Sequence, residues 1–343
     1  MNNKTAIVIG AGAFGTSIAS ILSENFKNVI VMMRSEDIYS SIKNGENSVY
    51  LPGQKLSSNI TPSLSWNETY SLIGIQDVGI VVNGLPTSAI RNYFSEHSEH
   101  LCRFMDRKIP FVSISKGIDP DTLEMSDDLF HDFFSEYQDY ITYLSGPSFA
   151  KEIVNKEVTI VALAGKNPDT LLSVCRMMGT EYFKCMPTYD IKGVLLGGAL
   201  KNILAIAGGI LEGLGYNHNT RAAMITRGIN EMLRFGKVFN ARPETFYSFA
   251  GMGDLILTTT SSLSRNKSFG MEIAKSKKEP QEIIDSQRSV VEGYKTTKAA
   301  FNLSEKYHIK APLFKGVYKI LYENVDPEVV LKQLMKLPIN SID

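Results

Sequence analysis

The sequence has no surplus of charge of either sign. Lys plus Arg and Asp plus Glu number 36 each, so the formal net charge is zero. A basic excess is the usual signature of proteins that bind nucleic acid or an anionic membrane surface. We therefore expect neither partner, and any anion-binding site has to be local.

Cysteine is scarce. Only Cys102, Cys175 and Cys185 are present, at spacings unlike those of metal ligands. An odd number of cysteines without a disulfide framework is typical of a reducing compartment. We expect a cytoplasmic protein with no metal site, in which the three cysteines serve as small buried hydrophobic residues.

A long uninterrupted apolar run is also missing. The N-terminus, MNNKTAIVIGAG, lacks the apolar core and cleavage site of a signal peptide. The best candidate for a membrane span, residues 193–215, contains Lys201, Asn202, Glu212 and many glycines. Because charged residues are costly inside a bilayer, we interpret this stretch as a buried helix and expect no integral membrane association.

The 343 residues, of which 43% are hydrophobic and 21% charged, are typical of a soluble protein with two domains. In the first half, apolar strand patterns alternate with helical patterns, which predicts a parallel sheet with crossover helices. The expected strands are residues 5–9, 29–33, 79–83, 111–115, 141–144 and 158–164. Residues 44–65 are expected to form a turn-rich rim, and residues 119–139, which carry no motif, surface structure.

Beyond Pro187 strand patterns nearly vanish. The expected helices are residues 190–213, 220–239, 268–276, 296–306 and 317–323. We therefore expect an α/β domain over residues 1–187 and an all-α domain over residues 188–343.

Gly10, Gly12 and Gly15 form a G-x-G-x-x-G motif directly after the first expected strand. The first glycine permits a tight turn, the second lets the backbone approach a pyrophosphate, and the third allows close packing of helix and strand. The following helix presents free N–H groups to the anion. This placement predicts a Rossmann domain that binds NAD(H) or NADP(H).

The end of the second expected strand bears on the choice of dinucleotide. The first polar residue there is Arg34, in VMMRSED. A carboxylate at this place would bind a ribose 2′-hydroxyl, whereas an arginine suits a 2′-phosphate. We therefore favour NADP(H), although Glu36 and Asp37 lie close enough to keep NAD(H) open.

Lys201 lies in the middle of the apolar stretch GGALKNILAIAGG. On a helix its neighbours include Gly197, Gly198 and Ala205, so it rises from a stripe of small residues. Such a stripe either lets another helix approach or leaves room for a ligand, and a packed helix would bury the charge. We expect the ligand, with burial and a second cation lowering the pKa of Lys201 toward that of an acid–base catalyst. The alternative is a lysine whose stem packs at a helix–helix contact.

Lys116 follows an apolar strand in SKGI, at the sheet edge where a doubly wound fold holds its cofactor; the alternative is an ordinary loop lysine. In AGMGDLILTTTSSLSRNKSFG, Asp254 is expected to cap or start a short helix. Ser264 is expected to cap a helix beginning at Arg265, with Asn266 in its first turn. Such a helix start is typical of a phosphate site, so the residues together predict reduction of a phosphorylated carbonyl compound.

Specific motifs occur along nearly the whole chain in the order GAGAFGTS, YLPG, SKGI, GPSFA, GALKNILAIAGGILEGLG, NTRAAMITRGINEM, AGMGDLILTTTSSLSRN, VVEGYKTT and APLFKGVYKIL. In these motifs the chain resembles the bacterial-type glycerol-3-phosphate dehydrogenase [NAD(P)+] family. The resemblance implies a Rossmann domain followed by a helical substrate domain like the C-terminal domain of 6-phosphogluconate dehydrogenase. It also implies a cytoplasmic homodimer that reversibly reduces dihydroxyacetone phosphate to sn-glycerol 3-phosphate for glycerophospholipid synthesis.

The resemblance further implies the site residues. The catalytic residues would be Lys201, as general acid and base, with Lys116 and Asp254. The substrate would contact Lys116, Gly146, Ser148, Lys201, Asp254, Ser264, Arg265 and Asn266. The cofactor would contact Gly10, Gly12, Ala13, Phe14, Gly15, Arg34, Lys116, Ala150, Arg265, Val290 and Glu292. The family often has Ser-Trp where this chain has Ala13-Phe14, so one hydroxyl is lost and the aromatic ring is kept.

Two other functions stay open on the residues alone. A two-domain dehydrogenase acting on a hydroxy acid would use Arg265 to bind a carboxylate. A non-catalytic NADP(H)-binding sensor would bind the cofactor without turnover, and it leaves Lys201, Asp254 and Lys116 unexplained. Turnover of dihydroxyacetone phosphate distinguishes both from the dehydrogenase that the resemblance implies.

Overall fold

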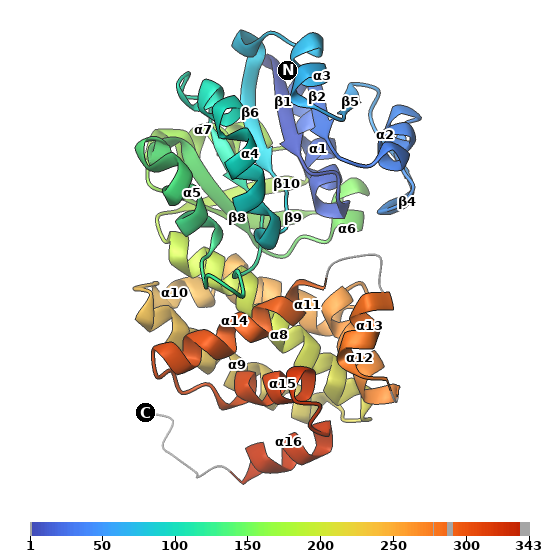
Figure 1. The fold of residues 1–343 in the computed structure, drawn as a ribbon, viewed down its shortest axis with the longest axis vertical. Coiled ribbons are helices and arrows are strands. Elements are labelled where there is room, and N and C mark those ends of the chain that lie inside the picture. The colour runs from blue at the N-terminus through green and yellow to red at the C-terminus, as the bar shows by residue number, and fades with distance from the viewer. Residues whose placement is uncertain (1, 277, 287–290, 337–343) are drawn as a thin grey trace. The chain divides into compact units, whose positions relative to one another are not determined.

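The computed structural model describes residues 2–276, 278–286 and 291–336, which fall into two compact units (Figure 1). The first unit comprises Met1–Lys116 and Glu124–Leu195, and the second comprises Gly117–Leu123 and Leu196–Asp343. The division therefore falls inside helix α8 (Ile191–Gly213), whereas the sequence places the boundary at residue 188, where the last strand of the first unit ends.

An eight-stranded sheet forms the centre of the first unit, in the order β10-β9-β8-β7-β6-β1-β2-β5. The strands are β1 (Asn2–Ile9), β2 (Phe26–Met32), β5 (Ile60–Ser63), β6 (Val78–Asn83), β7 (Phe111–Ser113), β8 (Ile141–Ser145), β9 (Thr159–Gly165) and β10 (Phe183–Thr188). The six neighbouring strands β5, β2, β1, β6, β7 and β8 all pair in parallel, and their order is that of a Rossmann fold. The predicted parallel sheet is thus confirmed for these six strands. By contrast, β9 runs antiparallel to β8, and β10 pairs in parallel with β9.

Helices connect these strands and cover the sheet. They are α1 (Ala13–Asn25), α2 (Glu36–Lys43), α3 (Trp66–Leu72), α4 (Thr87–Met105), α5 (Ser126–Phe134), α6 (Ala150–Val154) and α7 (Pro168–Met178), with 3-10 turns η1 (Ile75–Asp77) and η2 (Ser135–Tyr140). The central strand β6 is buried at every residue. A strand that is covered on both faces needs apolar residues throughout, which is why VGIVVN is visible in the sequence as a continuous run.

Two segments lie deeper in the first unit than the sequence predicted. Residues 44–65 form the small antiparallel pair β3 (Glu46–Asn47) and β4 (Leu51–Lys55), and they also supply β5, the edge strand of the main sheet. The part of residues 119–139 that lies in the first unit contains α5, whose Phe130 and Phe134 are buried with ring centroids 4.8 and 5.0 Å from that of Phe94. The expectation of surface structure was wrong for the apolar face of α5, because the apolar residues of SDDLFHDFF recur at helical spacing and face the core.

The second unit is helical. Besides most of α8 it contains α9 (His218–Val238), α10 (Pro243–Phe246), α11 (Asp254–Thr260), α12 (Arg265–Lys275), α13 (Pro280–Ser286), α14 (Glu292–Lys306), α15 (Pro312–Tyr322) and α16 (Pro327–Met335), with a π-helical turn η3 (Phe249–Gly253). Helix α8 is long and apolar enough to cross a membrane, but its apolar window is completely buried inside the protein. The prediction of a buried helix is therefore confirmed.

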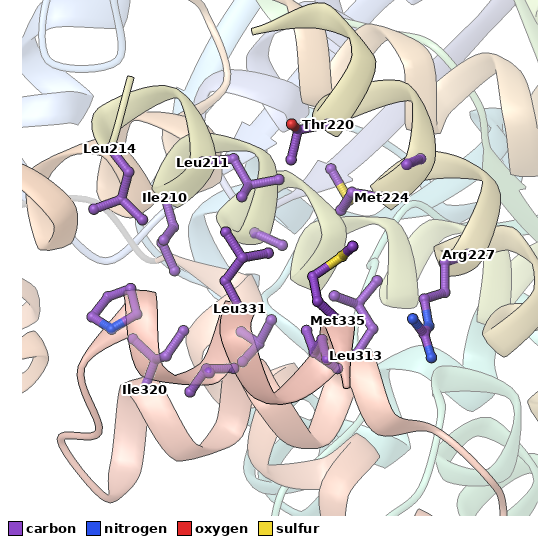
Figure 2. Close-up of a pocket in the computed structure, with 16 residues that line it drawn as sticks. Ile210, Leu211, Leu214, Thr220, Met224, Arg227, Leu313, Ile320, Leu331 and Met335 are labelled. Carbon is purple, nitrogen blue, oxygen red and sulfur yellow. The ribbon is translucent and has the colours of Figure 1, made fainter. Parts of the chain in front are cut away.

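An apolar cavity of about 160 Å³ lies within the second unit, between α8, α9, α15 and α16 (Figure 2). Ile210 and Leu211 of α8, Met224 of α9 and Leu331 and Met335 of α16 contribute to its lining. None of the site residues expected from the sequence is among the residues that line it, so this cavity is separate from the Lys201 region.

The cysteines are free thiols, and burial raises the pKa of each. Their thiols are thus poorly reactive, in keeping with a packing role. Among the described residues no group of three or more His, Cys, Asp or Glu side chains could hold a metal ion.

Glu231, on α9, is a completely buried carboxyl group. Its Oε1 accepts a hydrogen bond from the Leu313 N–H (2.8 Å), and its Oε2 accepts one from the Phe314 N–H (3.0 Å). These N–H groups lie in the first turn of α15, where no intrahelical acceptor exists, so Glu231 caps that helix from a neighbouring one. Burial raises the pKa of Glu231 to about 7, and the two N–H groups only partly oppose this effect.

The raised pKa predicts a pH dependence of stability. In the unfolded chain this carboxyl titrates near 4.5, so folding favours its protonated form. The resulting stabilisation is complete below pH 4.5 and is lost as the pH rises through 7. Between pH 5 and 8 we expect the wild type to lose up to about 3 kcal/mol of stability relative to Glu231→Gln. Melting temperatures of both proteins across this range test the prediction, and parallel profiles would contradict it.

Candidate active site

The loop Gly10–Gly15 links β1 to α1 in the first unit. Gly10 has a φ of 107°, and a Cβ there would lie 2.9 Å from the Gly84 carbonyl oxygen. A Cβ at Gly15 would lie 2.0 Å from the Gly10 carbonyl oxygen, whereas at Gly12 it would meet nothing within 4 Å. Gly12 is also the N-cap of α1 and offers no capping side chain, so the helix start is open. This geometry is compatible with the predicted roles of tight turn, open approach and close packing, and the loop fits a dinucleotide pyrophosphate.

Lys116 brings several predicted residues together at the end of β7. Its Nζ donates a hydrogen bond to the Gly146 carbonyl oxygen (3.0 Å) and another to Ser148 Oγ (3.5 Å). The same Nζ lies 5.4 Å from the ring centroid of Phe14, in the first turn of α1. An ordinary loop lysine would point into solvent, but Lys116 is half-buried and links the GPSFA segment to the glycine loop.

Arg34 follows β2 and is exposed. The next residue, Ser35, caps α2 by accepting a hydrogen bond from the Ile38 N–H (3.4 Å). Glu36 and Asp37 occupy the first turn of α2, where carboxylates are favoured by the helix dipole. The two acidic residues therefore have a structural reason to be there that does not depend on a ribose.

The remaining cofactor residues expected from the first unit are Ala13 and Ala150. They are the first residues of α1 and α6, and both are half-buried.

In the second unit, Lys201 forms a buried cluster with Asp254 and Thr258. Lys201 is 7% exposed and Asp254 is 1% exposed. The Lys201 Nζ donates to Asp254 Oδ1 and to Thr258 Oγ1, the latter at 3.0 Å. Thr258 in turn donates from Oγ1 to the Asp254 carbonyl oxygen (2.6 Å). The carboxylate compensates the burial of the ammonium, which answers the energetic objection to a lysine inside an apolar helix.

Thr258 was not predicted as a site residue. It lies four residues after Asp254 on α11, so the two side chains share one face of that helix. The four-residue spacing of Asp254 and Thr258 in DLILTTT was the sequence feature that could have identified Thr258 as a site residue.

Two glycines of α8 allow the backbone of other elements to approach closely. A Cβ at Gly197 would lie 2.5 Å from the Ala250 carbonyl oxygen of η3, and a Cβ at Gly209 would lie 2.0 Å from the Lys267 carbonyl oxygen of α12. The expectation that the stripe leaves room for a ligand is therefore wrong at Gly197, whereas Gly209 lies outside that stripe. The close approach of the η3 backbone does not leave the Lys201 ammonium without a counter-charge, because Asp254, at the start of α11, lies directly after η3 and pairs with Lys201.

Helix α12 begins at Arg265, and Ser264 caps it by accepting a hydrogen bond from the Lys267 N–H (3.2 Å), as predicted. The Arg265 side chain is exposed in the first turn. The Lys267 ammonium, by contrast, is buried, where it contacts Glu212 Oε2 (3.0 Å) and donates to the Thr260 carbonyl oxygen (3.0 Å). Arg265 is therefore the cation that this helix start offers to an anion in solution.

Asn266 connects α12 to two further helices. Its Nδ2 donates to Asn202 Oδ1 (3.0 Å), and its Oδ1 accepts from the Gly293 N–H (3.0 Å). Asn202 follows Lys201 directly and was not predicted as a site residue, although a second buried polar residue in GGALKNILAIAGG was a signal for it. Glu292 is the first residue of α14, and the expected cofactor residue Val290 lies outside the described residues.

The chain matches two family models along most of its length. Residues 5–171 match the model of the NAD-dependent glycerol-3-phosphate dehydrogenase N-terminus, and residues 190–332 match that of the corresponding C-terminus. A glycerol-3-phosphate dehydrogenase [NAD(P)+] of Leptospira biflexa is 38% identical over 330 residues, which are 96% of each chain. The enzyme of the same name from Bacillus subtilis is 36% identical over 334 residues, which are 97% of this chain and 94% of that one.

Solved structures show the same similarity. The glycerol-3-phosphate dehydrogenase of Coxiella burnetii is 28% identical with a TM-score of 0.89, and the match covers 98% of this chain and 100% of that one. A D-mandelate dehydrogenase matches with a TM-score of 0.61 at 12% identity, over 96% of this chain and 99% of that one. At such low identity the second match shows a shared fold only.

The close approach at Gly197 yields a prediction. Gly197→Ala would force a Cβ against the η3 backbone, which cannot move without shifting α11, so we expect a loss of about 1–3 kcal/mol. The matched control is Gly208→Ala on the same helix, where the nearest atom is the flexible Met224 Cε at 3.3 Å. We expect the control to stay near the wild type or to gain stability from its higher helix propensity. Melting temperatures compare the variants, and equal values for both would refute the packing role of Gly197.

Proposed function

Because the chain belongs to the NAD-dependent glycerol-3-phosphate dehydrogenase family, we propose that it reversibly reduces dihydroxyacetone phosphate to sn-glycerol 3-phosphate with NAD(P)H. The observation that carries this function is the buried cluster of Lys201, Asp254 and Thr258. Reduction of a ketone requires a proton donor for the carbonyl oxygen, and an ammonium held by two fixed partners is suited to that task. A protein that only binds a dinucleotide needs no such group.

Lys201 is the general acid of the proposed reaction. When bound, NAD(P)H supplies a hydride to the carbonyl carbon, and negative charge grows on the carbonyl oxygen. The Lys201 ammonium stabilises this charge and delivers a proton to the oxygen; in the reverse direction the neutral amine accepts the proton from the hydroxyl. Asp254 and Thr258 hold Nζ in place, so little reorganisation is needed. A positioned acid of this kind contributes about 10²–10⁴-fold to the rate.

Arg265 and the start of α12 are the proposed phosphate site. The arginine is exposed in the first turn of an eleven-residue helix, where N–H groups and the helix dipole favour an anion. Asn266 is held by Asn202 and Gly293, so its position is fixed before the substrate arrives. Binding energy from the phosphate would serve to position the distant carbonyl.

In the first unit the open N-terminus of α1 at Gly12 would hold the dinucleotide pyrophosphate. Phe14 and Lys116 lie beside this loop and would border the bound cofactor. We propose NADP(H) as the preferred form, because Arg34 is the exposed cation at the end of β2 and Glu36 and Asp37 are explained by α2.

The family resemblance also supports a cytoplasmic homodimer whose product enters glycerophospholipid synthesis. Sedimentation analysis of the purified protein would test the dimer.

Turnover and one substitution test the function together. The wild type is expected to oxidise NADPH with dihydroxyacetone phosphate and to leave 2-keto acids unreduced, whereas a hydroxy-acid dehydrogenase would show the opposite preference. Lys201→Ala removes the proton donor, so we expect kcat to fall about 10²–10⁴-fold while NADPH binding, measured by fluorescence titration, is retained.

The matched control is Lys192→Ala on the same helix. Lys192 Nζ pairs with Asp128 Oδ1 at 2.6 Å and has no part in the proposed reaction. Its loss should leave kcat near the wild-type value. Near-normal turnover of Lys201→Ala would contradict the assigned role, and absence of turnover in the wild type would contradict the function.

Arg34→Asp tests the dinucleotide preference. The substitution replaces a cation suited to a 2′-phosphate by a carboxylate that repels it and binds a 2′-hydroxyl. We expect the ratio of kcat/KM for NADPH to that for NADH to fall at least about tenfold. An unchanged ratio would remove Arg34 from the cofactor site.

A further inference from the structure

Asn47 is a completely buried polar residue in a segment that contains none of the proposed site residues. It ends the short strand β3, in the first unit, and is 0% exposed. A buried amide is costly unless its donors and acceptor are satisfied. The hydrogen-bond partners of Asn47 therefore indicate which part of the fold its side chain stabilises.

Both partners of the Asn47 amide nitrogen belong to the start of the dinucleotide-binding element. Nδ2 donates to the Ala11 carbonyl oxygen (2.9 Å) and to Thr16 Oγ1 (2.8 Å). Ala11 lies between the first two glycines of the loop, and Thr16 lies in α1 directly after the third. The side chain thus reaches back 36 residues to hold this loop from behind.

The orientation of the amide is determined by its surroundings. Oδ1 accepts a hydrogen bond from the Tyr50 N–H (3.2 Å), which closes the turn that leads into YLPG. Thr16 Oγ1 lies 3.4 Å from the Ala11 carbonyl oxygen, to which it donates, so its lone pairs are free to accept from Asn47. A flipped amide would place its oxygen against the Ala11 carbonyl oxygen and lose the bond from Tyr50.

The bond to Ala11 also sets the direction of the next N–H group. In a planar trans peptide the carbonyl and the following N–H point in opposite directions. The Ala11 carbonyl points to Asn47, so the Gly12 N–H points to the other side. Gly12 is the N-cap of α1, and a Cβ there would meet nothing within 4 Å, so the backbone beside this N–H is open to a pyrophosphate.

We propose that Asn47 is a positioning residue for dinucleotide binding: it holds the Ala11 carbonyl, and thereby the Gly12 N–H, in the orientation that a pyrophosphate requires. This inference rests on the proposed function, since it assumes that the loop binds NAD(P)H. Asn47 does not touch the cofactor; it acts through the Ala11–Gly12 peptide. A purely structural asparagine would stabilise the fold without affecting the affinity for the dinucleotide.

Asn47→Asp tests the contribution of the Asn47 amide N–H donor separately from that of its oxygen. The aspartate keeps an oxygen to accept from the Tyr50 N–H but cannot donate to Ala11, and it places negative charge beside that carbonyl. We expect the Kd for NADPH, measured by fluorescence titration, to rise at least about tenfold. In the nucleotide-free protein we expect faster hydrogen exchange at the amides of residues 10–16. Asn47→Ser, which is smaller and uncharged, provides the same comparison if a buried carboxylate prevents folding.

The matched control is Asn59→Ala in the same unit. Asn59 Nδ2 also donates to backbone carbonyls, those of Ser23 (2.9 Å), Phe26 (3.0 Å) and Lys27 (3.4 Å), but none of them belongs to the glycine loop. We expect this variant to lose stability with an unchanged Kd for NADPH and unchanged exchange at residues 10–16.

Thr16→Val removes one partner of Asn47 and leaves its bond to Ala11, so we expect a rise in Kd of less than about threefold.

Three outcomes are distinguishable. A raised Kd and faster loop exchange in the Asn47 variants, but not in Asn59→Ala, support the proposal. A wild-type Kd in Asn47→Asp and Asn47→Ser overturns it and leaves the dehydrogenase function intact. A wild-type protein that binds no NADPH overturns the function and this inference together.

Discussion

The buried ion pair between Lys201 and Asp254 is the interaction on which the second unit depends. An ammonium inside an apolar helix is tolerated only if a carboxylate is brought against it, and that requires α11 to approach α8 closely. Gly197 makes the approach possible, because any side chain there would collide with the backbone of η3. The proposed chemistry and the packing are therefore coupled, since the backbone contact between α8 and η3 also brings Asp254 to Lys201, the proposed proton donor.

The first unit is subject to a different constraint: at the proposed pyrophosphate site, the backbone N–H groups have to keep a fixed orientation toward the anion. Glycine provides the space and the unusual φ at Gly10, but it provides no rigidity. The hydrogen bonds from Asn47 supply what the glycines lack, because they fix the peptide between Ala11 and Gly12. Flexibility at a binding loop is thus offset by a buried amide from a segment outside the motif.

Fold and function separate clearly in this protein. The D-mandelate dehydrogenase match shows that the same two-unit plan is shared by a chain of only 12% identity. The side chains that bear on the proposed function of this chain lie at the starts of α11 and α12. Asp254 pairs with Lys201, the proposed proton donor, Arg265 is the exposed cation of the proposed phosphate site, and Asn266 is held between two other helices. These residues, and the family to which the chain belongs, carry the assignment.

The sequence by itself determined the features that depend on neighbouring residues. The cap of α12 at Ser264 and the tight turn at Gly10 follow from local backbone geometry, so the motifs predicted them correctly. Only the tertiary structure decided contacts between distant residues. It paired Asp254 with Lys201, packed the η3 backbone against Gly197 of the stripe, and brought Asn47 to the dinucleotide loop. Spacing along the chain reports which residues share a helix face or a turn, but not which other element the fold packs against that face.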